Sequence, residues 1–401
     1  MNTSMKNNFN KTFPGFKLLF KQSSLPFLLL YYLFIFSISN YTESVLLIKL
    51  FSSILIFVFW NDIKVLYFKT NSKKIIISVG IILFYLFITV LYSKNIQFGF
   101  IKLSTIVVSY IPLIIATYMV FNQKSLASIF LYLLIFVSSA GTIIALIIAP
   151  FDYSTVYSFS LQRWSHVVFG RIIGLALLIN VYLILSRYNG ITRIYIQISL
   201  QLLSIGLLFS GARGAILLSF LGILVLTLFV KSLLYNKLAL FIQIFVSVIL
   251  FMLIVPSHNR IVEMNGSLLN KQITDSSVLS RIESYQIALE RWGSSPVIGI
   301  GLGGFNTFYK SDLPQKMIYP HNMLLETLVE LGLVGIILFL TFLLSLLTKL
   351  WKIRHEFTIF FLYAFGLAML SKDLASSPML FAFVAIYFLK EPSSKKIILI
   401  N

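Results

Sequence analysis

Long uninterrupted apolar runs, separated by short polar stretches, dominate the chain. Twelve runs can be marked, at about residues 24–40, 44–60, 75–92, 98–121, 125–149, 167–187, 194–210, 214–230, 238–256, 322–348, 357–371 and 374–389. Many of them reach the roughly 20 residues that an α-helix needs to cross a bilayer. Because the apolar positions are continuous rather than alternating, they do not fit a transmembrane β-barrel. The pattern predicts an all-α polytopic membrane protein with about 12 transmembrane helices.

One polar stretch is far longer than the others and divides the chain. It runs from Ser257 to His321 and places 65 residues between two apolar runs. We therefore expect an N-terminal bundle of about nine helices in residues 1–256 and a loop at residues 257–321. About three C-terminal transmembrane helices would follow in residues 322–401.

The basic residues are distributed unevenly between the two sides of this topology. If the N-terminus lies inside, 19 Lys and Arg residues fall on the inner side and only four on the short outer connections. This asymmetry predicts that both termini are cytoplasmic and that the long loop is external. The inner connections account for most of the net charge of +19, which therefore does not indicate a nucleic-acid partner. The absence of cysteine excludes disulfides and thiol chemistry.

A helix is predicted inside the long loop. Residues 275–277 offer N-caps, and Gly293 followed by Pro296 offers a stop. Apolar residues recur between them at helical spacing: Val278, Ile282, Tyr285, Leu289 and Trp292. At about 100° per residue, Arg281 falls at the edge of this stripe and Arg291 falls toward the polar face. We therefore expect Arg281 to face the packed side of the helix and Arg291 to face water.

Four arginines are expected near the outer membrane boundary, where burying a charge is costly. Arg163 and Arg171 flank the start of one apolar run. Arg213 sits in the short break between two runs, and Arg281 lies on the loop helix. A cluster of guanidinium groups suits phosphate, which it grips with paired hydrogen bonds. Ordinary helix packing or snorkelling also explains Arg213, and a salt bridge or snorkelling also explains the other two membrane arginines.

His321 stands between the long loop and the next apolar run. Asn322 follows it and is a good N-cap for the helix that begins there. The positive end of that helix dipole disfavours imidazolium, so a neutral His321 could accept a proton. A histidine that simply belongs to the membrane interface explains the position as well. Glu326, one turn into the helix, either balances an arginine inside the bundle or favours the helix start.

Four glycines cluster upstream of His321, at positions 299, 301, 303 and 304. They lie on the external loop without a βαβ context, so they indicate a tight turn rather than a dinucleotide loop. The chain contains no HExxH motif, no nucleophile elbow and no clustered acidic pair. We therefore expect neither a metal nor an organic cofactor.

Three motifs in the second half of the chain resemble a single family. His321-Asn322 is followed, after nine residues, by Gly332-Leu-Val-Gly335. Upstream stand Ser280-Arg281, Tyr285, Ala288, Pro296 and Gly299-Ile-Gly301, and earlier still Ser210-Gly-Ala-Arg213-Gly214. Together they resemble the O-antigen ligases and the related O-antigen and capsule polymerases, over roughly residues 205–348.

This resemblance implies a metal-independent, inverting glycosyltransferase of the GT-C type. Its donor would be a glycan on undecaprenyl diphosphate, reached from the outer face of the bacterial inner membrane. By correspondence with the family motifs, Arg213 and Arg281 would hold the diphosphate and His321 would activate the acceptor hydroxyl. The remaining candidate substrate-binding residues are Arg163, Arg171, Asn322 and Glu326.

The motifs leave the acceptor open. A polymerase would move the growing chain onto the next lipid-linked repeat unit, and a chain-length regulator protein would then be a partner. A ligase would move the finished chain onto lipid A-core. The polymerase is slightly favoured because the loop pattern is the generic one of the broad family. A transporter of polyprenyl-linked glycans is a further alternative, for which discontinuous helices or repeated halves would be expected; a purely structural membrane scaffold is another.

Overall fold

A computed structural model gives the fold of this chain. It describes residues 14–35, 43–59, 73–148, 166–186, 191–230, 232–254, 276–307, 319–353, 355–371, 373–387 and 389. Within these ranges every regular element is a helix and no strand occurs, as the apolar pattern predicts.

The helices follow the apolar runs closely. The N-terminal half contains α2 (Pro14–Ile35), α3 (Glu43–Ile54), the 3-10 helix η1 (Leu55–Phe59), α5 (Lys73–Leu91), α6 (Ile96–Phe121), α7 (Lys124–Ile148) and α9 (His166–Leu185). The middle contains α10 (Ile191–Phe209), α11 (Arg213–Phe229), α12 (Leu234–Ile254), α14 (Ser276–Ser294) and η2 (Gly304–Thr307). The C-terminal part contains α15 (Met323–Ile353), α16 (His355–Ser371), η3 (Leu374–Ser376), α17 (Pro378–Ala382) and α18 (Val384–Tyr387).

Five of the described helices are long and apolar enough to cross a membrane. They are Ile96–Phe121, Lys124–Ile147, Val167–Leu185, Leu234–Leu253 and Met323–Ile353. Shorter apolar helices pack around them, so the chain is an all-helical membrane protein. The total of about twelve transmembrane helices stays a prediction.

The last apolar run differs from the prediction. Residues 374–389 do not form one helix, because η3, α17 and α18 divide them into three short pieces. The first break falls at Ser377, directly before Pro378. A residue that precedes proline is pushed out of the helical region, and proline itself begins helices readily. Apolar composition alone therefore overestimates the helix length here.

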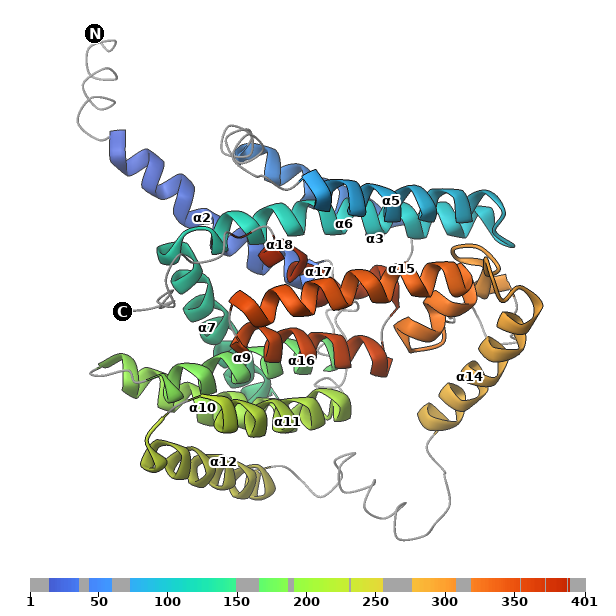
Figure 1. The fold of residues 1–401 in the computed structure, drawn as a ribbon. Coiled ribbons are helices and arrows are strands. Elements are labelled where there is room, and N and C mark those ends of the chain that lie inside the picture. Colours follow the sequence, from blue (N-terminus) through green and yellow to red (C-terminus); the bar gives the residue numbers. More distant parts are fainter. Residues whose placement is uncertain are drawn as a thin grey trace.

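Helix α9 lies at the centre of the bundle (Figure 1). It packs against α7, α10, α11 and α16, and residues 170–183 are all buried. A helix that is apolar on every side fits a position with neighbours on every side. Helix α14 lies across one end of the bundle, and α15 begins beside it. We name this end the loop end.

Helix α15 is broken near the loop end. The backbone of Gly332 adopts a φ of 68°, which is not helical. The break removes the normal intrahelical partners of the carbonyls of Val329 and Glu330. It also removes the partners of the N–H groups of Leu333 and Val334. Buried backbone groups must find hydrogen bonds elsewhere, because leaving them unpaired is costly.

The glycine-rich segment that follows α14 provides the donors for this break. The Ile300 N–H donates to the Val329 carbonyl at 3.0 Å, and the Gly301 N–H donates to the Glu330 carbonyl at 2.9 Å. The segment, residues 296–304, therefore completes the helix from outside. We name it the glycine loop.

The same loop also provides the acceptors. The Leu333 N–H donates to the Pro296 carbonyl at 2.9 Å, and the Val334 N–H donates to the Val297 carbonyl at 3.1 Å. Four backbone hydrogen bonds thus join the loop to the two halves of α15. Such an approach requires a residue without a side chain, since a Cβ atom at Gly332 would overlap the Val297 carbonyl oxygen.

Helix α5 contacts α15 at its break, and the turn after α5 holds the other side of the glycine loop. The Tyr85 hydroxyl donates to the Leu331 carbonyl at 2.7 Å, and the Ser93 hydroxyl donates to the Leu302 carbonyl at 2.8 Å. The cluster does contain the predicted turn, in which the Gly304 N–H donates to the Gly301 carbonyl at 2.9 Å. Gly299 lets the loop lie directly against α15, whereas Gly301 lies against Ser93 and Gly303 against Gly99 at the start of α6.

The break predicts a specific sensitivity at Gly332. Gly332→Ala should lower the thermal unfolding temperature of the detergent-solubilised protein. A left-handed backbone costs a non-glycine residue about 1–2 kcal/mol, and the new methyl group would also displace the loop. Gly80→Ala in α5 is the matched control, because a Cβ atom there meets nothing within 4 Å. Equal unfolding temperatures for the two variants would contradict this account of the break.

Candidate functional site

Helix α14 packs against α15 through small residues. Ser284 and Ala288 form its buried line, and small side chains let two helix backbones approach closely. The predicted apolar stripe is therefore partly wrong, since Ile282 and Leu289 are 43% and 52% exposed. A hydropathy pattern predicts that large apolar side chains form the packed face of a helix. Close contact between two helices instead requires small side chains on that face.

Arg281 and Arg291 flank this buried line on opposite sides. At 100° per residue around the helix axis, each arginine lies about 40° from the direction midway between Ser284 and Ala288. Arg281 faces the bundle, as predicted, because its charge acts on groups of the helix core. The prediction for Arg291 is wrong, since this residue is partly buried and its Nε atom is inaccessible to water. The error follows directly from the misplaced stripe.

Four side chains from three parts of the chain converge at the loop end. Arg281 comes from α14, Arg171 comes from α9, and Tyr319 and His321 precede α15. The charges of both arginines act on His321 and on Tyr319, and they also act on each other. The Tyr319 and His321 rings are 4.6 Å apart at their centroids. Two guanidinium groups and one imidazole therefore share one site.

The site keeps His321 neutral. Burial is the largest cause that lowers its pKa, followed by the charges of Arg281 and Arg171, and together they bring the pKa to about 4. The sequence predicts a neutral imidazole from the helix dipole alone, whereas burial and two nearby cations produce it in the structure. At neutral pH the ring is therefore unprotonated.

The backbone at His321 is itself unusual. Its φ of 53° lies in the left-handed region, and no other described non-glycine residue has a positive φ. Such a conformation costs about 1–3 kcal/mol and commonly occurs where function requires it. Asn322 then caps α15 as predicted, because its Oδ1 accepts the N–H groups of Leu324 and Leu325 at 3.0 Å each. The cap therefore fixes where the backbone of His321 lies relative to the start of α15.

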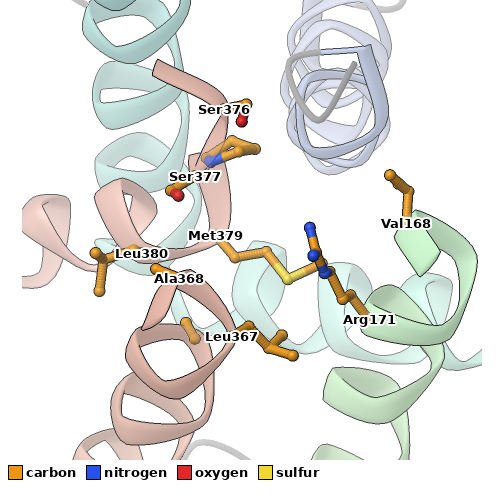
Figure 2. A pocket seen from close by; sticks show the side chains of 10 residues that line it. Val168, Arg171, Leu367, Ala368, Ser376, Ser377, Met379 and Leu380 are labelled. Atoms are coloured by element: carbon orange, nitrogen blue, oxygen red, sulfur yellow. The ribbon is translucent and has the colours of Figure 1, made fainter. Parts of the chain in front are cut away.

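Arg171 lines a pocket of about 320 Å³ that is partly open to the outside. The residue is only 5% exposed. Val168 lies beside it, and one face of α16 and residues 376–380 complete the lining. Figure 2 shows the Met379 side chain extending across this pocket toward the Arg171 side chain. The Tyr363 hydroxyl donates to the Arg171 carbonyl at 2.9 Å and holds α9 against α16.

Arg213 occupies a different setting at the same end of the bundle. It is exposed and is the first residue of α11. The short break before it packs tightly on α9, since a Cβ atom at Gly170 would overlap Ser210 and Ala212. Arg213 thus lies beside the turn of α9 that carries Arg171, but on the surface. The predicted site residue Arg163 lies outside the described residues.

The sequence allows Glu326 to pair with an arginine inside the bundle, but in the structure its partner is a lysine. Its carboxylate forms a buried ion pair with Lys102 of α6, and Glu330 pairs with the same ammonium group at 2.6 Å. Glu326 also accepts the Leu374 N–H at 2.8 Å. This triad of charges joins α6, α15 and the segment after α16. Glu326 is therefore placed to support the site rather than to line its surface.

Sequence reasoning did not identify Lys102, although the signal was present. Lys102 is a single lysine inside an apolar run, and Glu326 and Glu330 lie four residues apart in another. Carboxylates at this spacing point from the same helix face. A buried cation and a buried acidic pair in different membrane helices are expected to find each other.

The arrangement as a whole suits one kind of chemistry. Two guanidinium groups provide paired donors for phosphate oxygens, and a neutral imidazole beside them can accept a proton. Among the described residues, no three His, Asp or Glu side chains are grouped so that they could hold a metal ion.

Comparison with known proteins finds a family model that matches part of the chain. Residues 198–340 match the family model described as O-antigen ligase. This region contains Arg213, Arg281, His321 and Glu326, and it agrees with the span of the sequence resemblance. No curated protein and no solved structure matches the chain.

The buried triad makes a stability prediction. Lys102→Met should destabilise the protein by about 3–5 kcal/mol, because it leaves two carboxylates buried without their cation. Adding Glu326→Gln and Glu330→Gln should restore much of the loss, since both negative charges are then removed. Thermal unfolding in detergent measures both changes. A Lys102→Met protein as stable as the unaltered chain would show that the triad contributes little.

Proposed function

We propose that this chain, of which residues 198–340 match the family model described as O-antigen ligase, acts as a member of the O-antigen ligase and polymerase family and transfers a glycan from undecaprenyl diphosphate to a sugar hydroxyl. The observation that carries this proposal is the neutral His321 beside the guanidinium groups of Arg171 and Arg281. A base next to a cationic cluster is what transfer from a diphosphate-linked sugar requires.

In the proposed step His321, the acceptor hydroxyl and the diphosphate each have one role. The imidazole of His321 accepts the proton of the acceptor hydroxyl, whose oxygen forms a bond to C1 of the donor sugar. The bond between C1 and the diphosphate oxygen breaks, and its electron pair leaves with the diphosphate. Attack from the face opposite the leaving group inverts the configuration at C1.

The arginines act on the leaving group. Negative charge grows on the diphosphate as the bond breaks, and preplaced guanidinium groups stabilise it more strongly there than in the ground state. Arg171 and Arg281 are placed for this role, and Arg213, on the nearby surface, is proposed to hold the outer phosphate. Because the positive charge comes from side chains, the proposed mechanism needs no metal ion.

The acceptor is proposed to be the next lipid-linked repeat unit, which makes the enzyme a polymerase. The alternative is lipid A-core, and the match to the family model described as O-antigen ligase does not separate the two acceptors. In both cases the loop end would face outward from the bacterial inner membrane. This orientation follows from the positive-inside asymmetry of the lysine and arginine residues.

The transporter alternative needs a separate argument, because α15 is discontinuous. In transporters the exposed backbone of broken helices coordinates substrate or ions. Here the glycine loop of the same chain occupies the break through four backbone hydrogen bonds. The break therefore offers no backbone groups to a transported solute, and the enzyme proposal is preferred.

Surface glycan in a deletion strain tests the proposed function. His321→Asn and Arg281→Gln should each fail to restore normal lipopolysaccharide, with transfer reduced about 10²-fold or more. Asparagine tolerates the left-handed backbone at position 321, so its effect isolates the loss of the imidazole. Arg193→Gln, which removes an exposed charge at the start of α10, is the control and should restore the glycan.

The same gel separates the two acceptors. Core carrying a single repeat unit in the deletion strain indicates a polymerase, and bare core with long lipid-linked chains indicates a ligase. Normal glycan with His321→Asn and with Arg281→Gln would refute the catalytic proposal.

The lowered pKa of His321 predicts the pH dependence. The neutral imidazole is the active form, so kcat/KM of purified protein should fall only as the pH drops through about 4. Arg281→Gln removes one of the charges that lower this pKa, and the acid limb of its residual activity should move to higher pH. An acid limb near 6.5 in the unaltered enzyme, or no movement in the variant, would contradict the assigned electrostatics.

A further inference from the structure

A second cavity lies next to the Arg171 pocket. It has a volume of about 650 Å³ and an almost entirely apolar lining, contributed by α2, α6, α7, α9, α16, α17 and α18. Packed interiors leave few voids larger than a water molecule. An apolar space between the helices of a bundle is a common place for a ligand. We name it the α9 cavity.

The α9 cavity adjoins the Arg171 pocket. Met379 lines both this cavity and the Arg171 pocket. On α9, Leu175, Ile179 and Tyr182 follow Arg171 at helical spacing, and all three line the cavity. One face of α9 therefore leads from the guanidinium group into apolar space over about 16 Å, at 1.5 Å per residue.

We propose that the α9 cavity holds the polyprenyl chain of the donor while Arg171 binds its diphosphate, an assignment that rests on the proposed function. A buried cation at the mouth of an apolar cavity matches an amphiphile with an anionic head and a hydrocarbon chain. The two spaces meet at one shared residue, Met379.

A third space competes for the same role. An apolar groove of about 840 Å³ lies between α5, α6 and α15. It is separated from the Arg171 pocket, because the Tyr110 hydroxyl donates to the Leu374 carbonyl and accepts the Ser377 N–H at 3.1 Å. The Tyr110 ring also stacks on Phe381 with centroids 4.1 Å apart. These contacts close the groove toward Arg171, so the α9 cavity is the better continuation.

Photo-crosslinking in the full-length protein tests the assignment. Phe360 lines the α9 cavity and Phe339 lines the groove, and they are 6% and 7% exposed. Each is replaced by p-benzoyl-phenylalanine, an aromatic residue, and irradiated with radiolabelled undecaprenyl diphosphate in nanodiscs. Phe357, which is 8% exposed in the same cavity, serves if the Phe360 variant does not fold.

Labelling at position 360 should exceed labelling at 339 by about tenfold. Arg171→Gln should reduce it by about tenfold, because a charge-assisted contact with the phosphate is lost. Unlabelled undecaprenyl phosphate should compete, and excess phosphatidylglycerol should not. Preferred labelling at 339, or displacement by phosphatidylglycerol, would overturn the proposal.

The two proposals fail separately in this experiment. Glycan transfer without labelling at 360 or 357 would overturn the cavity assignment and leave the proposed function intact. Labelling at 360 by a protein that transfers no glycan would refute the proposed function and support the cavity as a polyprenyl diphosphate site.

Discussion

The loop end of this protein depends on how the break in α15 is satisfied. Four backbone groups lose their partners around Gly332, and the glycine loop pairs with all four. The loop follows directly after α14, so docking it on α15 also fixes where α14 ends. Ser284 and Ala288 then hold α14 close to the first turns of α15. A requirement of the backbone in apolar surroundings therefore brings the helix of Arg281 to the helix that His321 precedes.

The charges gathered at this end are arranged in two groups. Arg171 and Arg281 repel each other, and the neutral state of His321 avoids adding a third positive charge. In a second group, Lys102 pairs with both Glu326 and Glu330. The carboxylate of Glu326 is engaged with Lys102 and with the Leu374 N–H. The two acidic residues thus stabilise the packing of α6 against α15, while the two arginines face the site. A bound diphosphate would offset the repulsion between these arginines.

The sequence predicts the helices well because long apolar runs determine where transmembrane helices form. Even the short break between α10 and α11 lies where it is predicted. The site is predicted in part. Asn322 predicts the cap of α15, but the break at Gly332 and the strained φ of His321 are tertiary properties. The phase of α14 is wrong because small residues make its contact. The partner of Glu326 could not be chosen, since several membrane cations were available to it.

The short helices after α16 show what the bundle gains from an interrupted helix. A continuous helix over residues 374–389 would satisfy its own backbone, whereas the interrupted segment needs the Tyr110 hydroxyl for Ser377 and the Glu326 carboxylate for Leu374. Irregular backbone is tolerated in a membrane protein only where it is buried in protein or lines a cavity. Here it does both, because residues 376–380 line the Arg171 pocket and Met379 also lines the α9 cavity. Giving up helical hydrogen bonds at Ser377 thus allows one segment to bound both the pocket that holds the Arg171 cation and the apolar α9 cavity, which is the arrangement that an amphiphilic donor requires.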